Sequence, residues 1–124
     1  MALSKSDILN ADDMPTEEVN VPEWGGTVII STMTSTARDA YEAEMYHANK
    51  AQNGGEFVNL RARMVARCAR DEQGELLFTD DDIEALGKKS AAALDRCYEV
   101  AERLNKFSEE DIAELSGESV SVQS

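Results

Sequence analysis

Few side chains in this chain of 124 residues are of the types that carry out catalysis or bind metals. His47 is the single histidine, and Glu44 lies three residues before it on the same predicted helix. A catalytic histidine needs a nucleophile or carboxylate held beside it, and iron sites built from Glu-x-x-His need that motif on two helices. We therefore interpret His47 as a half-exposed helical residue, and we expect no catalytic residue, no metal and no cofactor.

The two cysteines, Cys68 and Cys97, are 29 residues apart and lack a CxxC spacing. Each falls on the apolar stripe of a predicted helix, which favours two reduced core thiols over a disulfide or a pair of metal ligands. The chain contains neither a G-x-S-x-G nucleophile motif nor a phosphate-binding glycine loop. These residue types predict a protein that is not an enzyme.

Residues 71–84 hold seven acidic side chains and no basic one, a composition that raises the question of calcium binding. An EF-hand loop counted from Asp71 needs glycine at its sixth position, where this chain has Leu76. A turn followed by an acid-rich helix start explains the same residues, because carboxylates are favoured near a helix N-terminus. We expect no calcium site.

The charge balance of the chain restricts its partners. Twelve Lys and Arg residues against 25 Asp and Glu residues leave a net charge of −13. Nucleic acids and anionic lipids would repel such a chain, so we expect neither as a partner. The sequence has no apolar run of about 18 residues that could span a membrane, and residues 1–5 lack the apolar core of an export signal. We expect an acidic cytoplasmic protein.

Three arginines recur at helical spacing in this acidic chain, namely Arg63, Arg67 and Arg70. One interpretation is a solvated face that pairs with the acids of residues 71–84. The other is an electrostatic contact site for an acidic partner or for a second copy of the chain. A head-to-tail contact of this kind would make a homo-oligomer, either a ring or a spiral.

Three further residues are candidates for partner contacts. Glu44 and Arg61 each fall near the middle of an apolar stripe on consecutive predicted helices, where a charge must be paired or must face an interface. We predict that these two residues pair across the seam between the helices, or that the seam widens there into a partner groove. Trp24, at the tip of a predicted hairpin, either packs on the helices or serves as a contact anchor.

The elements that must position these residues predict an α+β fold. Polar–apolar alternation in residues 18–21, turn residues at 22–26 and a β-branched run at 27–32 predict a β-hairpin. Apolar spacing and capping residues predict helices over 3–10, 36–52 (capped by Thr36), 56–70, 79–86, 90–107 and 108–115. Because a lone hairpin is marginally stable, we expect it to pack on four to five helices. One domain would span residues 1–116, and residues 117–124 would form a disordered tail.

Five segments follow one another in a recognisable order. They are Leu3-Ser4-Lys5-Ser6-Asp7-Ile8-Leu9, Val19-Asn20-Val21-Pro22-Glu23-Trp24-Gly25-Gly26-Thr27-Val28, Arg61-Ala62-Arg63-Met64-Val65-Ala66-Arg67-Cys68, Asp71-Glu72-Gln73-Gly74 and Leu77-Phe78-Thr79-Asp80-Asp81-Asp82-Ile83-Glu84-Ala85-Leu86-Gly87. Together they resemble the tail assembly chaperones of long-tailed bacteriophages and prophages, over residues 3–115. The strongest parts of the resemblance are the hairpin and the last segment.

The resemblance implies a non-enzymatic assembly factor in the cytoplasm of the infected host, absent from the mature virion. Its implied client is the aggregation-prone tape-measure protein, around which it would recruit tail-tube subunits. Many members of the family also have a longer form, made by ribosomal frameshifting, that is believed to engage the tube protein. The resemblance supplies no binding residues. An acidic decoy that mimics DNA is the alternative function, and acids arranged in blocks rather than in long parallel rows weigh against it.

Overall fold

The computed structural model describes residues 1–50 and 59–105. The predicted helix over 108–115 and the predicted disordered tail over 117–124 lie outside the described residues. So do the last two residues of the helix predicted over 36–52, the first three of the helix predicted over 56–70 and the last two of the helix predicted over 90–107.

The predicted hairpin is present. Strand β1 (Thr16–Val21) and strand β2 (Gly26–Ser31) pair antiparallel and are joined by the short 3-10 helix η1 (Pro22–Trp24). Gly25 closes the turn in the left-handed region, with φ of 77°, a conformation that glycine adopts without a steric penalty. In β1, Val19 and Val21 are buried while the residues between and before them are more exposed, so the alternation in the sequence sets which face meets the core.

A third strand, β3 (Ala69–Arg70), pairs antiparallel with Ile29 and Ile30 of β2 and completes a sheet of order β1-β2-β3. These two residues were predicted as the end of a helix over 56–70, and that prediction is wrong. Helix α3 (Leu60–Cys68) ends at Cys68, and Ala69 is extended, with φ of −79° and ψ of 129°. Backbone pairing with β2 replaces the last helical turn.

The remaining helices follow the predicted order. They are α1 (Lys5–Leu9), α2 (Ser35–Lys50), α4 (Ile83–Leu86), which follows the 3-10 turn η2 (Asp80–Asp82), and α5 (Ala91–Leu104). Capping boxes at Ser4 and Thr79 begin α1 and η2 as the sequence predicts. Helix α2 begins earlier than predicted, because the Thr34 hydroxyl, rather than that of Thr36, accepts a hydrogen bond of 3.1 Å from the Ala37 N–H.

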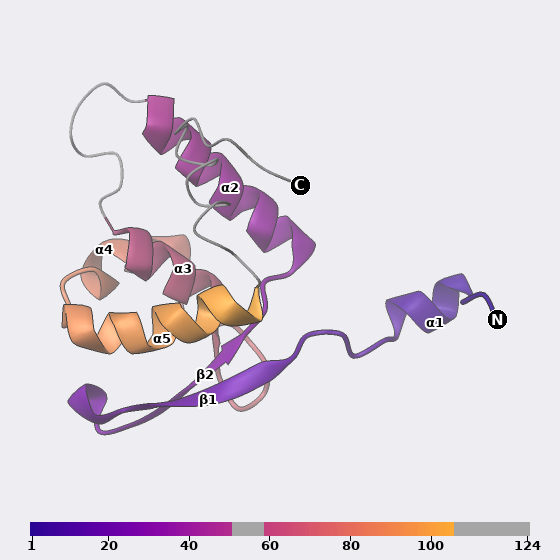
Figure 1. The fold of residues 1–124 in the computed structure, drawn as a ribbon, viewed down its shortest axis with the longest axis horizontal. Coiled ribbons are helices and arrows are strands. Elements are labelled where there is room, and N and C mark those ends of the chain that lie inside the picture. The colour runs from indigo at the N-terminus through magenta and orange to yellow at the C-terminus, as the bar shows by residue number, and fades with distance from the viewer. Residues whose placement is uncertain (51–58, 106–124) are drawn as a thin grey trace, which may run out of the picture.

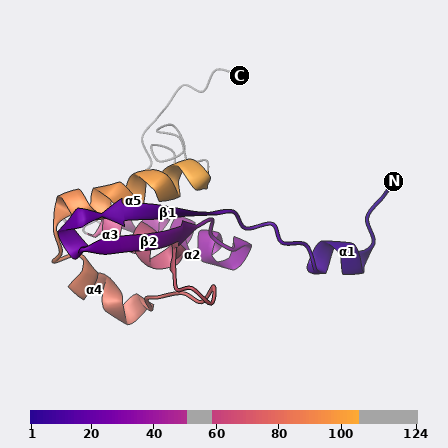
Figure 2. The same cartoon turned by 90° about the horizontal axis from the view of Figure 1, so that it is seen from below.

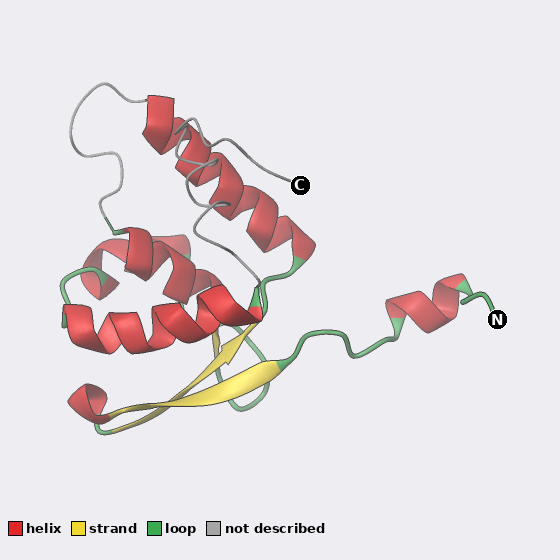
Figure 3. Cartoon of the chain, in the orientation of Figure 1, coloured by secondary structure: helices red, strands yellow, loops and turns green. Residues whose placement is uncertain are grey.

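Helices α3 and α5 pack on one another and on the sheet, and the core lies between these layers (Figure 1). In Figure 3 the strands form the lower edge of this body, and α2 rises away from it beyond α3. The fully buried large side chains come from every layer of this core: Tyr41, Ile30, Met64, Val21, Val65, Cys68 and Cys97. The fold is therefore α+β, with an N-terminal antiparallel sheet packed on helices.

Helix α1 stands apart from this body at the end of an extended segment (Figure 1). None of its residues is buried, and Leu3, Ile8 and Leu9 are 70%, 57% and 72% exposed. Its own capping box, rather than packing, defines the helix.

Candidate functional site

The seam between α2 and α3 holds a cluster of charges. The Glu44 carboxylate accepts from Arg63 Nη1 at 3.2 Å and lies 3.1 Å from Arg67 Nη2. Arg67 also pairs with Asp80 at 2.9 Å, and its side chain is only 16% exposed. One acidic residue of α2 therefore holds two arginines of α3, and one of these also holds the start of the η2 turn.

Arg61 lies away from this seam. Its guanidinium pairs with Asp95 of α5, and both side chains are about half exposed. The predicted pair between Glu44 and Arg61 is therefore wrong, and the alternative, a partner groove at the seam, stays a prediction. The helix turns Arg63 and Arg67 towards α2, whereas Arg61 faces α5, so consecutive charges on α3 serve different neighbours.

Arg70 is separated from the other two arginines of the predicted stripe because it belongs to β3. Its Nε donates to Ser31 Oγ at 2.7 Å, and its Nη1 donates to the Gly74 carbonyl at 2.8 Å. Of the acids in residues 71–84, Asp80 is the partner that the structure gives to this stripe. The three arginines thus lie at two places, and Arg63 and Arg67 alone share a carboxylate.

Trp24 lies in the η1 turn, which is fastened to α5. Arg96 of α5 donates to both carboxylate oxygens of Glu23, at 2.9 and 3.2 Å, and this guanidinium lowers the pKa of Glu23. The Trp24 side chain still leaves 36% of its surface exposed. The turn is thus held on α5 through Glu23, and a contact role for the partly exposed Trp24 stays a prediction.

The cysteines and the histidine, the residue types that could carry chemistry, lie in the core and at the surface, respectively. Cys68 and Cys97 are free and fully buried, which confirms the prediction of reduced core thiols, and burial raises their pKa values to about 12 and about 11. His47 is exposed, and its ring meets that of Tyr46 edge to face at 5.9 Å. Within residues 1–50 and 59–105, no group of three His, Cys, Asp or Glu side chains is placed to hold a metal ion. None of the helices described is long and apolar enough to cross a membrane.

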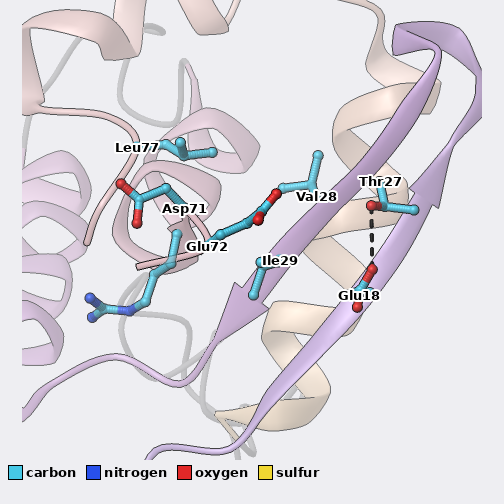
Figure 4. Close-up of a pocket in the computed structure, with 8 residues that line it drawn as sticks. Glu18, Thr27, Val28, Ile29, Asp71, Glu72 and Leu77 are labelled. Carbon is cyan, nitrogen blue, oxygen red and sulfur yellow. Dashed lines mark hydrogen bonds between the residues drawn. The ribbon is translucent and has the colours of Figure 1, made fainter. Parts of the chain in front are cut away.

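A groove of about 590 Å³ lies beside the sheet and was not predicted (Figure 4). Glu18 of β1 accepts from Thr27 Oγ1 of β2 at 3.4 Å on one side, and the turn that carries Asp71 and Glu72 forms the other side. Its full lining comprises Glu18, Thr27, Val28, Ile29, Arg70, Asp71, Glu72 and Leu77. The alternation of β1 already indicated that Glu18 points away from the core, but the approach of residues 71–77 depends on β3.

Sequence reasoning also missed the partners that fasten the sheet to α5. Glu17 of β1 accepts from Arg103 at 2.8 and 3.0 Å, and Glu23 pairs with Arg96 as described above. Their signal was weak, because two exposed acids and two exposed arginines far apart in the chain have no periodicity in common. The described residues thus present charged contacts, an open groove and exposed apolar side chains.

Comparison with known proteins agrees with this description. The solved structure of the bacteriophage HK97 tail assembly chaperone aligns with a TM-score of 0.59 and 17% sequence identity, covering 80% of this chain and 94% of that one. At this identity the likeness shows a shared fold. Among curated protein sequences, none matches the chain. The phage tail assembly chaperone family matches residues 8–116, nearly the whole sequence, and the chain therefore belongs to the phage tail assembly chaperones.

Proposed function

We propose that this chaperone binds the tape-measure protein of its phage, keeps it soluble and helps to recruit tail-tube subunits around it. The observation that carries the proposal is the family match over residues 8–116, which includes every element of the sheet and the helices α2 to α5. The proposed role needs no catalysis, and the chain acts as a binding protein.

The surface of the chain suits such a role. Exposed apolar side chains include Leu3, Ile8 and Leu9 on the N-terminal arm and Leu76 and Leu77 beside the sheet. A net charge of −13 opposes self-aggregation of a protein that carries such side chains. An acidic carrier with local apolar contacts could therefore hold an aggregation-prone client in solution.

The proposal extends to place and partners. The chaperone works in the cytoplasm of the host bacterium and leaves before the virion is complete. A longer frameshifted form would engage the tube protein. Self-association through the arginines of α3 is a weaker part of the proposal, because Arg67 already pairs with Glu44 and Asp80 within one chain.

The test is co-expression of the tape-measure protein of the same genome with and without this chain. The expected result is a higher soluble yield of the client and its co-purification with the chaperone. A matched control replaces the chaperone with another acidic protein of similar size and charge. If the client yield is unchanged and nothing co-purifies, the proposal fails, and salt-sensitive binding to a DNA-binding protein becomes the next test, because that result would favour the acidic decoy.

A further inference from the structure

We propose that the groove beside the sheet binds an extended, positively charged segment of the client. This inference rests on the proposed function and assigns it to one surface, defined by Glu18, Thr27, Ile29, Glu72 and Leu77. Three features of the groove carry the inference: an open face of the sheet, an unpaired strand edge and a surplus of carboxylates.

The groove lies on the face of the sheet that points away from α5. Val19 and Val21 of β1 are 7% and 0% exposed on the packed face, so Glu18, the residue before Val19, turns to the other face. Glu18 is paired with Ile29, which therefore turns the same way. In Figure 2, β1 and β2 lie nearest the viewer with α3 and α5 behind them, so this face of the sheet is turned outward.

The edge of β2 is only partly covered. Strand β3 pairs with Ile29 and Ile30 alone, and in the described part of the chain no strand lies beside residues 26–28 on that side. Unpaired backbone groups on a strand edge can add a further strand from another chain. The groove runs along this edge, because Thr27, Val28 and Ile29 all line it.

The charge of the groove lining favours a positively charged partner. Glu18, Asp71 and Glu72 contribute three carboxylates, against one guanidinium from Arg70. Arg70 donates to Ser31 Oγ and to the Gly74 carbonyl, and both of these acceptors are neutral. The lining therefore has a net negative charge, which complements Lys or Arg side chains.

Apolar contact is available beside these charges. Leu77, which lines the groove, is 48% exposed, and Leu76 next to it is 44% exposed. Alternate residues of an extended segment point to opposite sides, so such a segment can place basic side chains on the carboxylates and apolar ones on these leucines. The occupant that fits is therefore an extended client segment in which basic and apolar residues alternate.

The test titrates the ¹⁵N-labelled chain with overlapping peptides of the tape-measure protein and with two designed probes. One probe alternates lysine with valine, and the other alternates glutamate with valine. The basic probe and at least one client peptide rich in Lys or Arg should shift the amide signals of residues 26–29 and 71–77. They should also slow amide exchange along residues 26–28. The acidic probe should leave these signals unchanged.

Charge reversal separates the groove from the rest of the acidic surface. Glu72→Lys should weaken binding of the basic probe about tenfold at low salt, because a like charge then faces the ligand. The matched control is Glu84→Lys, an equal change of charge at an exposed position of α4 that does not line the groove. The affinity of this variant for the basic probe should stay within about twofold of that of the unchanged chain.

Several results would overturn the assignment. The assignment is wrong if the shifts centre on α2 or on the N-terminal arm, or if Glu72→Lys and Glu84→Lys bind the basic probe with the same affinity. It is also wrong if the signals of residues 26–29 move with protein concentration alone, which would make a second copy the occupant. If the full-length client co-purifies equally well with Glu72→Lys, this surface is wrong while the proposed function stands. If the client does not bind the unchanged chain, the proposed function itself fails, and the inference falls with it.

Discussion

At the scale of single residues, Asn105 joins three parts of the fold through one side-chain amide. Its Oδ1 accepts from the Met33 N–H at 2.7 Å, at the entry to α2. Its Nδ2 donates to the Ala101 carbonyl at 2.8 Å and to Cys68 Sγ at 3.5 Å. The residue is 8% exposed, so water cannot readily replace these partners.

Asn105→Ala should lower the free energy of unfolding by about 2 kcal/mol, because it leaves the Met33 N–H buried without an acceptor. Urea unfolding followed by circular dichroism measures the change. Asn10→Ala is the control: the Asn10 amide donates to Ser6 Oγ at 3.4 Å on the exposed arm. That change should alter the free energy of unfolding by less than about 0.5 kcal/mol. Equal effects of the two substitutions would contradict the role given to Asn105.

The buried thiols make stability depend on alkaline pH. Burial raises the pKa of Cys68 from 9.0 to about 12 and that of Cys97 from 9.0 to about 11. Above about pH 9 the unfolded chain therefore binds fewer thiol protons than the folded chain, so stability is full below that pH and falls as pH rises towards 11 and 12. Burial also raises the pKa of Tyr98, from 10.0 to about 12, and acts in the same direction.

Urea unfolding at a series of pH values from about 8 to about 10.5 should show a steadily falling free energy of unfolding, steeper above about pH 9. Cys97→Ala removes one of the two thiols and should make the fall shallower. The slopes of the free energy of unfolding against pH are compared, because the substitution also changes packing at neutral pH. A free energy of unfolding that stays level over this range would show that the thiols titrate alike in both states.

At the scale of elements, the charged seam determines how α2 is held. Contacts of α2 with the rest of the body fall mainly on α3, where Glu44 meets Arg63 and Arg67 and is 23% exposed. Replacing Glu44 by glutamine removes the charge and leaves the shape nearly the same. Arg67, 16% exposed, would then keep Asp80 as its acidic partner.

Glu44→Gln should lower the free energy of unfolding by about 1–2 kcal/mol, because a partly buried guanidinium loses a charged partner. It should also raise amide exchange in α2 more than in α5. The matched control is Glu42→Gln, which breaks the exposed pair with Arg38 on the same helix. That pair is worth about 0.5 kcal/mol or less. If Glu42→Gln and Glu44→Gln are equally destabilising, the seam does not hold α2 in the way inferred.

Local patterns in the sequence predicted most elements, because each pattern reports on a face that the element itself buries. The hairpin followed from alternation and turn residues, and the buried stripe of α5 (Leu94, Cys97 and Ala101) followed from helical spacing. Strand β3 could not be predicted in this way. Ala69 and Arg70 continue the helical spacing, and they become extended only because Ile29 and Ile30 offer pairing partners from far along the chain.

The contact candidates show the same division. The sequence predicted that these residues need partners, because a charge on an apolar stripe must be paired. Glu44 has two such partners, Arg63 and Arg67. Their actual partners depend on which way α3 faces its neighbours. Asp95 reaches Arg61 because α5 lies alongside α3, and that packing is set by the whole core rather than by any short segment. The groove was missed for this reason too, since β3 brings its two sides together.

At the scale of the whole molecule, the excess of acidic residues sets a balance between attraction and repulsion. Six arginines make ion pairs in the described part of the chain, and the side chains involved are mostly exposed. Such pairs contribute little each and weaken in salt. The net charge of −13 acts in the opposite sense, because repulsion among the remaining carboxylates is relieved by salt.

Repulsion should dominate, so raising sodium chloride from about 20 mM to about 500 mM should increase the free energy of unfolding by about 1 kcal/mol. Urea unfolding at a fixed neutral pH measures the difference. Glu72→Gln combined with Glu75→Gln removes two exposed charges from one turn beside Asp71, so this variant should be more stable at low salt and should gain less from added salt. A fall in stability with added salt would mean that the arginine pairs outweigh the repulsion. The high negative charge would then not destabilise the folded chain.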